Sequence, residues 1–381
     1  MMSILNKTCW NKTTHLSVLL TPDYFMSVYS EIYLFDEDVL SIRETSISIS
    51  IIFMLFGIIG NIISLYAFTK RKLLENKFNF YLLVVSAFRL IFCVTIFTDY
   101  FFNTIADQKI FLHDFNRLSS IIIDFILHTS DSCIAILTVF LSMDRLYAIK
   151  NPMKVKEFIT HLHAKFLIGF SVFNIILFKA ISFAVCELNV EDKVHIVYCT
   201  FISPTIFNLI PLLVILVLNT LLVSELVKYY RNALKRIQNN EELIIAIELE
   251  EREDLPKQRK FNQRSSRRHN TSASLCIQQC SSKKMTNLQK SHCFIILVID
   301  IWCTLTSIPY YFLNTFFILF HLNIFDIQKL IIIQIISSVF FNSNYCISIF
   351  IYFIFYNDFR VVLMELFKKY FSKKRLLIIT V

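Results

Sequence analysis

Seven long apolar stretches constrain the fold of this chain more than any other feature. They cover residues 46–68, 78–102, 118–149, 165–185, 201–227, 293–320 and 329–355. Each is long enough to cross a bilayer as a helix, and a helix satisfies all its backbone polar groups in hydrocarbon. A hydrophobic content of 55% and a mean hydropathy of +0.58 exclude an ordinary soluble domain. The sequence predicts an all-α membrane protein, a seven-transmembrane helix bundle.

Glycine is scarce, with 3 residues in 381. Transporters and channels often use small residues for close helix packing and broken helices at their binding sites. The scarcity, and the absence of an internal repeat, favour a bundle of large side chains. A multi-span transporter or channel is the alternative from a different class.

The formal charge of +9 reflects membrane topology rather than nucleic-acid binding, because the basic residues cluster beside the apolar stretches. Alternate loops hold 15 Lys and Arg against 7 on the other side, leaving out the long linker at 228–290. The sequence therefore predicts that residues 1–45 form an extracellular arm. They precede a bundle at 46–356, and the linker is its third cytoplasmic loop.

Two more segments fit this topology. The arm carries the glycosylation sequons of Asn6 and Asn11, which matter only outside the cell. In the tail at 357–381, Phe359 and Leu363 begin an apolar helical pattern surrounded by lysines. This pattern predicts an amphipathic helix 8 on the inner leaflet, in contact with membrane lipids.

The third stretch ends in Asp144-Arg145-Leu146, and Pro152 follows in the next loop. These residues resemble the rhodopsin-like (class A) G-protein-coupled receptors, in which Asp-Arg-Tyr ends the third helix. Further matches lie on the expected helices in the expected order: Gly60, Asn61, Pro211, Pro309, Tyr352, Phe359 and Arg360. Asn219 stands in place of the family's tyrosine, as in some invertebrate FMRFamide-type neuropeptide receptors.

The resemblance implies a plasma-membrane receptor that binds an extracellular ligand and activates a heterotrimeric G protein. In the family, the carboxylate pairs with the adjacent arginine at rest, and the freed arginine contacts the G protein. The residues expected to carry coupling here are Asp144, Arg145, Pro152, Asn219 and Tyr352. A receptor-shaped protein that no longer couples is a further alternative.

Several departures mark a divergent member. Arg89 replaces the family's sodium-binding aspartate, and a buried arginine needs a partner, for which we hypothesise Asp131 or a neighbouring acid. Ser307 replaces the sixth-helix tryptophan, and Ser348-Ile349 replaces Asn-Pro in the seventh helix. We expect an intramembrane polar network made of Asn61, Arg89, Asn344 and Ser348.

The family's disulfide from the third helix to the second outer loop does not carry over, because Ser120 stands at the helix position. Cys186 and Cys199 both lie around that loop. We expect that they bridge each other, and the alternative is that one of them bonds Cys9.

The ligand pocket is expected on one face of the third helix. Asp124, His128 and Asp131 follow one another at spacings of four and three, and Tyr310 lies beside Pro309 of the sixth stretch. Leu127 occupies the position where aminergic receptors hold their amine. The acids favour a small basic peptide. A small chemosensory molecule, or internal packing of the three polar residues, is the alternative.

No catalytic constellation is present: the sequence has no His-Glu-x-x-His, Gly-rich phosphate loop or nucleophile elbow. Cys276 and Cys280 have no His or Cys partner at zinc spacing. We expect no enzyme activity, no cofactor and no metal. Ligand identity, G-protein subtype and oligomeric state do not follow from the sequence.

Overall fold

A computed structural model describes residues 37–74, 76–106, 113–151, 161–188, 205–254, 287–320 and 327–379. Within these ranges every regular element is helical. The elements are α3 (Glu37–Phe68), α4 (Arg71–Leu74), α5 (Lys77–Ala106), α6 (His113–Lys150), α8 (His161–Leu188), the π-helical turn η3 (Thr205–Leu209), α10 (Ile210–Asp254), α12 (Asn287–Phe320), α13 (Ile327–Phe355) and α14 (Asn357–Ile379).

Seven of these helices are long and apolar enough to span a membrane, with mean hydropathies from 1.5 to 2.6. They correspond to the seven predicted stretches, and an additional helix, α14, follows the seventh. Large apolar side chains such as Phe166 and Phe170 face outward, as expected where the surrounding solvent is lipid. The predicted fold class is confirmed.

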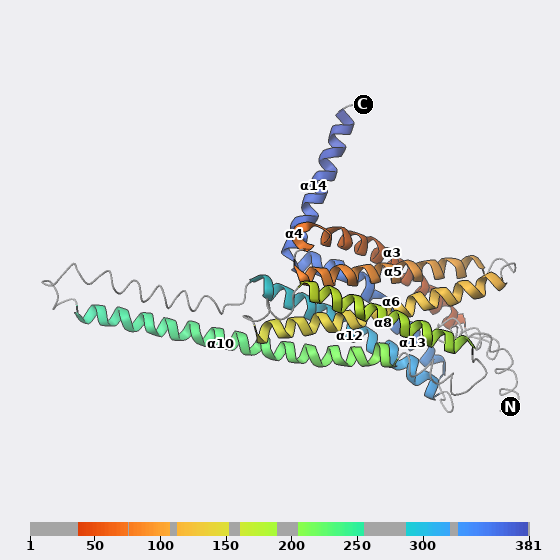
Figure 1. Cartoon of the computed structure of the whole chain (residues 1–381), viewed down its shortest axis with the longest axis horizontal. Helices are drawn as coiled ribbons and strands as arrows, with labels where there is room; N and C mark the ends of the chain where they lie inside the picture. The colour runs from red at the N-terminus through yellow and green to blue at the C-terminus, as the bar shows by residue number, and fades with distance from the viewer. Residues whose placement is uncertain are drawn as a thin grey trace.

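The most buried spanning helices are α6 and α13, each half buried, compared with 22% for α8. In the bundle, α3 packs against α5 and α13, while α6 contacts α5, α8 and α10, and α12 packs against α13 (Figure 1). Because α6 touches helices on several sides, polar groups along its length are held between neighbours rather than exposed to lipid.

Glycines permit the close approach of α3 to its two neighbours. A Cβ added at Gly57 would lie 2.6 Å from Cys93 Sγ, and one at Gly60 would lie 2.8 Å from Ile349 Cγ2. Gly169 on α8 has no neighbouring atom within 4 Å of such a Cβ. Two of the few glycines are therefore used where α3 meets α5 and α13.

Two helices extend beyond the bundle at the same end. The spanning part of α10 ends at Asn232, and the helix continues to Asp254 (Figure 1). Pro211 directly follows the π-helical turn η3, and a proline inside a helical segment removes a backbone hydrogen bond of the kind that such a local irregularity accommodates. At this end, α14 leaves the bundle at a steep angle, the direction expected of a helix on a membrane surface.

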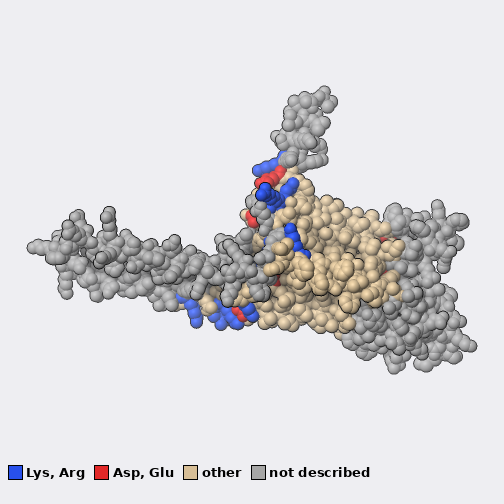
Figure 2. All heavy atoms as spheres, in the orientation of Figure 1, with Lys and Arg blue, Asp and Glu red and all other residues tan. Residues whose placement is uncertain are grey.

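Lys and Arg gather at this end in Figure 2, on the extension of α10 and around the start of α14, whereas the side of the bundle is almost free of visible charge. The apolar band thus ends where the basic residues begin, as expected at a membrane–water boundary.

Candidate functional site

A cavity of about 110 Å³ lies between α5, α6, α12 and α13 at the end of the bundle away from α14. All four predicted pocket residues line it: Asp124, His128, Asp131 and Tyr310. The structure adds residues that the sequence did not mark, among them Asp99 of α5 and Tyr311 of α12. We call this the polar cavity.

Asp131 joins three helices at the polar cavity. Tyr345 of α13 donates its hydroxyl to Asp131 Oδ1 at 2.6 Å. Tyr311 of α12 donates its hydroxyl to Asp131 Oδ2. Phe92 stacks on the Tyr345 ring with centroids 3.7 Å apart and so fixes its orientation. Both carboxylate oxygens are therefore held by neutral hydroxyl donors from helices other than α6.

The hypothesis that Arg89 pairs with Asp131 differs from what the structure shows. Asp131 is bonded to tyrosines, and the cation within electrostatic range of it is Lys179 of α8. Lys179 is 7% exposed, with its amine 4.7 Å from the Phe207 ring centre. It is buried between helices rather than extended to the membrane surface.

The acid within electrostatic range of Arg89 is Asp300 of α12. Both side chains are buried, at 3% and 0% exposure, and Ser142 donates to Asp300 Oδ2 at 2.6 Å. Arg89 Nε and Nη1 make no hydrogen bond among the described residues. Asp300 is absent from the predicted site, although an acid inside the apolar run FIILVIDIW gives the same signal as Arg89.

Two of the four predicted network residues bond neighbouring helices. Asn61 Nδ2 donates to the Tyr345 carbonyl of α13 at 2.9 Å, which confirms that Asn61 faces another helix. Asn344 accepts from Thr306 at 2.6 Å and donates to Ser307 at 2.9 Å. Ser307, where the family has tryptophan, thus joins α12 to α13 by a hydrogen bond. Ser348 is buried as well.

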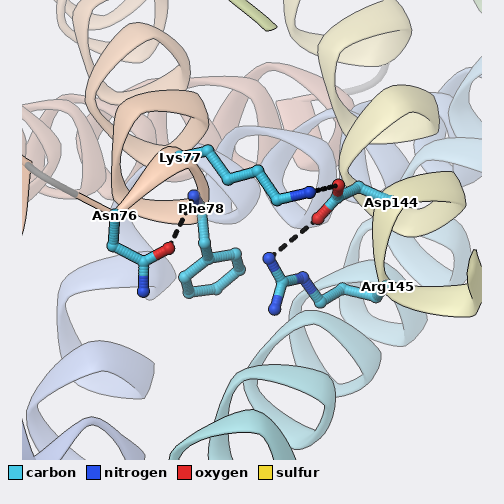
Figure 3. Close-up of polar contacts among 5 residues, drawn as sticks. All are labelled: Asn76, Lys77, Phe78, Asp144 and Arg145. Atoms are coloured by element: carbon cyan, nitrogen blue, oxygen red, sulfur yellow. Dashed lines mark hydrogen bonds and ion pairs between the residues drawn. The ribbon is translucent and has the colours of Figure 1, made fainter. Parts of the chain in front are cut away.

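The second cluster lies near the other end of α6, at the Asp-Arg dipeptide. Lys77 Nζ lies 2.7 Å from Asp144 Oδ1, and Arg145 Nη2 lies 2.8 Å from Asp144 Oδ2 (Figure 3). Asn76 accepts the Phe78 N–H at 3.1 Å and caps the start of α5, which places Lys77 and Phe78 beside α6. Lys77 was not predicted, because nothing in a loop lysine indicates its partner.

Aromatic rings cover Arg145, which is only 5% exposed. Its guanidinium lies 4.4 Å from the Phe78 ring centre, and His292 of α12 stacks on Phe78 with ring centres 4.1 Å apart. Tyr356, after α13, meets His292 edge-on and donates to Asn79 Oδ1 at 2.7 Å. Burial raises the pKa of Tyr356, so its hydroxyl remains a neutral donor. We call Lys77, Phe78, Asp144, Arg145 and His292 the Arg145 cluster.

Of the remaining predicted coupling residues, the structure describes Tyr352 and Asn219. Tyr352 is fully buried and packs edge-on against Phe68, 5.3 Å between ring centres. Asn219 of α10 is 5% exposed, and its amide makes no hydrogen bond within the described ranges. Pro152 lies outside the described residues.

Most of the residues predicted to be glycosylated or disulfide-bonded are not described by the structure. Asn6, Asn11, Cys9 and Cys199 lie outside the described residues, as does the side chain of Cys186. Five described cysteines are free thiols inside the spanning helices: Cys93, Cys133, Cys293, Cys303 and Cys346. In the part of the chain that the structure describes, no three His, Cys, Asp or Glu side chains form a metal-binding group.

A scan against models of protein families gives no match, and a search of curated proteins finds no similar sequence. The functional conclusion therefore rests on the two clusters and on the helix that connects them.

Proposed function

We propose that this protein is a class A G-protein-coupled receptor that binds an extracellular ligand in the polar cavity and activates heterotrimeric G proteins through the Arg145 cluster. The observation that carries the proposal is that one central helix, α6, holds both sites. Asp131 in the cavity and Asp144 in the cluster are separated by about 20 Å of helix, at 1.5 Å per residue.

Both sites also involve α12, through Tyr311 at the cavity and His292 at the cluster. A ligand that binds one arrangement of α6 and α12 more tightly shifts the population toward it. Arg145 is covered in the described arrangement, so G-protein contact requires α12 and the Phe78 ring to move away from it. This is a switch between two packings rather than a rigid binding surface.

The charge distribution supports the membrane orientation that this function needs. Basic residues gather at the end of the bundle from which α10 and α14 extend (Figure 2). Under the positive-inside rule, that end is cytoplasmic. The polar cavity then faces the extracellular side of the plasma membrane, and the amino-terminal arm with its sequons is outside.

The cavity chemistry supports a basic ligand. Carboxylates of Asp99, Asp124 and Asp131 line it together with aromatic rings, and this combination attracts ammonium and guanidinium groups. A small basic neuropeptide is the favoured ligand, and a chemosensory cation is the alternative within the same fold.

One observation favours the transporter alternative: Arg89 and Asp300 place opposite charges deep in the bundle. Intramembrane charges often line an ion or proton path. In a transporter, substituting Arg89 or Asp300 abolishes solute flux, whereas in a receptor the protein shows no flux at all.

The proposal is tested by expressing the protein with promiscuous G proteins and applying a library of basic peptides. We expect a peptide to raise second-messenger levels, and Arg145→Ala to abolish the response at equal surface expression. Arg71→Ala, which removes an exposed arginine of α4, is the matched control and should retain it. An Arg145→Ala variant that signals like the wild type contradicts the coupling role.

A further inference from the structure

We propose that the polar cavity admits one cationic group, an alkylguanidinium or alkylammonium, and that this group binds Asp131 in place of the two tyrosine hydroxyls. Asp131 is then the residue through which the ligand's charge changes the packing of α12 and α13. The inference rests on the proposed function for treating the cavity as a ligand site, and it goes further by naming the chemical group and the bonds it replaces.

The size of the cavity limits what enters. Its volume is about 110 Å³, and an apolar cavity of about 150 Å³ in another protein holds one benzene. A planar guanidinium with a short alkyl stem fits this space, whereas a whole peptide does not. The remainder of a peptide ligand therefore stays above the cavity, and only one side chain reaches Asp131.

The charge of the cavity selects the sign of that group. Three carboxylates and no lysine or arginine occur among the described residues that line it. Tyr310 and Phe341 stack with ring centres 4.2 Å apart and form an aromatic wall. Aromatic faces attract cations, and most strongly cations removed from water.

The hydrogen-bond donors to Asp131 are neutral hydroxyls that a cation can replace. Lys179 lies in electrostatic range, but it makes no direct ion pair with Asp131 in the described structure, where Tyr311 and Tyr345 fill both carboxylate oxygens. A guanidinium offers two parallel N–H donors and a positive charge to the same two oxygens. The cation is the stronger partner, and the tyrosine hydroxyls are the groups that must leave.

Displacement has a structural consequence, because Tyr311 belongs to α12 and Tyr345 to α13. Losing both bonds separates these helices from α6 at the cavity. Trp302 of α12 donates its indole N–H to Ser343 of α13 at 3.3 Å, so its fluorescence reports a change between the two helices. The chain has only 2 tryptophans, and Trp10→Phe leaves Trp302 as the single reporter.

The experiment uses full-length Trp10→Phe protein in nanodiscs, with butylguanidinium as the probe and butylurea as its neutral isostere. We expect butylguanidinium to raise the thermal unfolding midpoint and shift the Trp302 emission, with no effect from butylurea. Asp131→Asn should weaken butylguanidinium binding about 10- to 100-fold, the usual effect of losing a charged hydrogen-bond partner.

Tyr311→Phe and Tyr345→Phe distinguish replacement from simple lining of the cavity. Because each removes a competing donor, each should tighten butylguanidinium binding about 3- to 10-fold and shift the Trp302 emission without ligand. Tyr66→Phe, on the exposed part of α3, is the control and should change neither. These variants keep the test decisive if Asp131→Asn does not fold.

Equal binding of butylurea, undiminished binding by Asp131→Asn, or weaker binding by both Tyr→Phe variants overturns the inference. The assay contains no G protein, so the two proposals fail separately. If butylguanidinium binds at Asp131 but no ligand produces cellular signalling, only the proposed receptor function is contradicted. If a peptide signals with equal potency in the wild type and in Asp131→Asn, only the inference about Asp131 is contradicted.

Discussion

The two carboxylates of α6 that join helices, Asp131 and Asp144, are held in different ways. Asp131 accepts hydrogen bonds from two tyrosine hydroxyls, whereas Asp144 lies between the cations Lys77 and Arg145. The hydroxyls come from α12 and α13, and the cations come from α5 and from α6 itself. One carboxylate is therefore bonded to neutral donors on two other helices, and the other is neutralised by charge.

This difference indicates which of the two carboxylates exchanges its partners first. An incoming cation replaces a neutral hydroxyl without leaving a buried charge unpaired. Removing Asp144 from its cluster leaves two cations without a counter-charge, and one of them is only 6% exposed. We infer that a change begins at the Asp131 end and that the Asp144 end resists it until α12 has moved. Substitutions at and away from these two sites test this order of strength.

The largest effect is expected from Asp144→Ala. It leaves Lys77 and Arg145 unpaired in a mostly buried site, which typically costs about 3–5 kcal/mol. Asp131→Ala leaves two hydroxyls without an acceptor and should cost less, about 1–3 kcal/mol. Thermal unfolding of purified protein in detergent checks the order, with the exposed Glu365→Ala as a control. A costlier Asp131→Ala would reverse the comparison.

Lys77→Met removes one of the two cations from Asp144. The Lys77 side chain is 15% exposed, so the loss should be about 1.5–3 kcal/mol, and Lys77→Arg should recover most of it. Lys228→Met breaks an ion pair whose lysine is 63% exposed and should cost at most about 0.5 kcal/mol. Equal losses at the two lysines mean that the Asp144 pair is no stronger than a surface pair.

Tyr345→Phe removes one hydroxyl from Asp131 and keeps the ring against Phe92. Because Tyr311 still donates to the carboxylate, we expect a loss of about 1–2 kcal/mol, measured by the same unfolding assay. Tyr345→Phe added to Asp131→Ala should have almost no further effect, because the acceptor is already absent. Full additivity shows that the hydroxyl acts elsewhere.

The smallest effect is expected where a buried polar group has no partner. The Asn219 amide makes no hydrogen bond in the described part of the chain, so Asn219→Leu removes no interaction and should be neutral or stabilising by up to about 1 kcal/mol. Asn61→Leu, which loses a 2.9 Å bond to the Tyr345 carbonyl, is the comparison and should destabilise. An Asn219→Leu variant that unfolds readily indicates an interaction outside the described contacts.

Much of the fold follows from the sequence, because hydropathy over a span is a local property. The run at 46–68 ends with α3 at Phe68, and the run at 118–149 ends within one residue of α6 at Lys150. The helices extend past the apolar runs at their other ends, at Glu37 and His113, where polar residues continue the helix without being apolar.

Positions on one face of a helix were also predictable, and partners were not. The spacing of Asp124, His128 and Asp131 correctly places them along one cavity. The partner of Asp131, however, depends on how α12 and α13 rotate, and two tyrosines reach it instead of Arg89. Lys77 becomes informative only after the helices are packed together, whereas Asp300 stands out in the sequence as an acid within an apolar run and only its partner requires the packed structure.

The most direct test of the account measures nucleotide exchange on purified heterotrimeric G proteins by the protein reconstituted in vesicles, without ligand. Asp144→Asn should raise basal exchange, because it weakens the restraint on Arg145, and Arg145→Ala added to it should return exchange to the level of empty vesicles. Exchange that stays at the empty-vesicle level in wild type and in both variants, across the G-protein classes, would contradict the account.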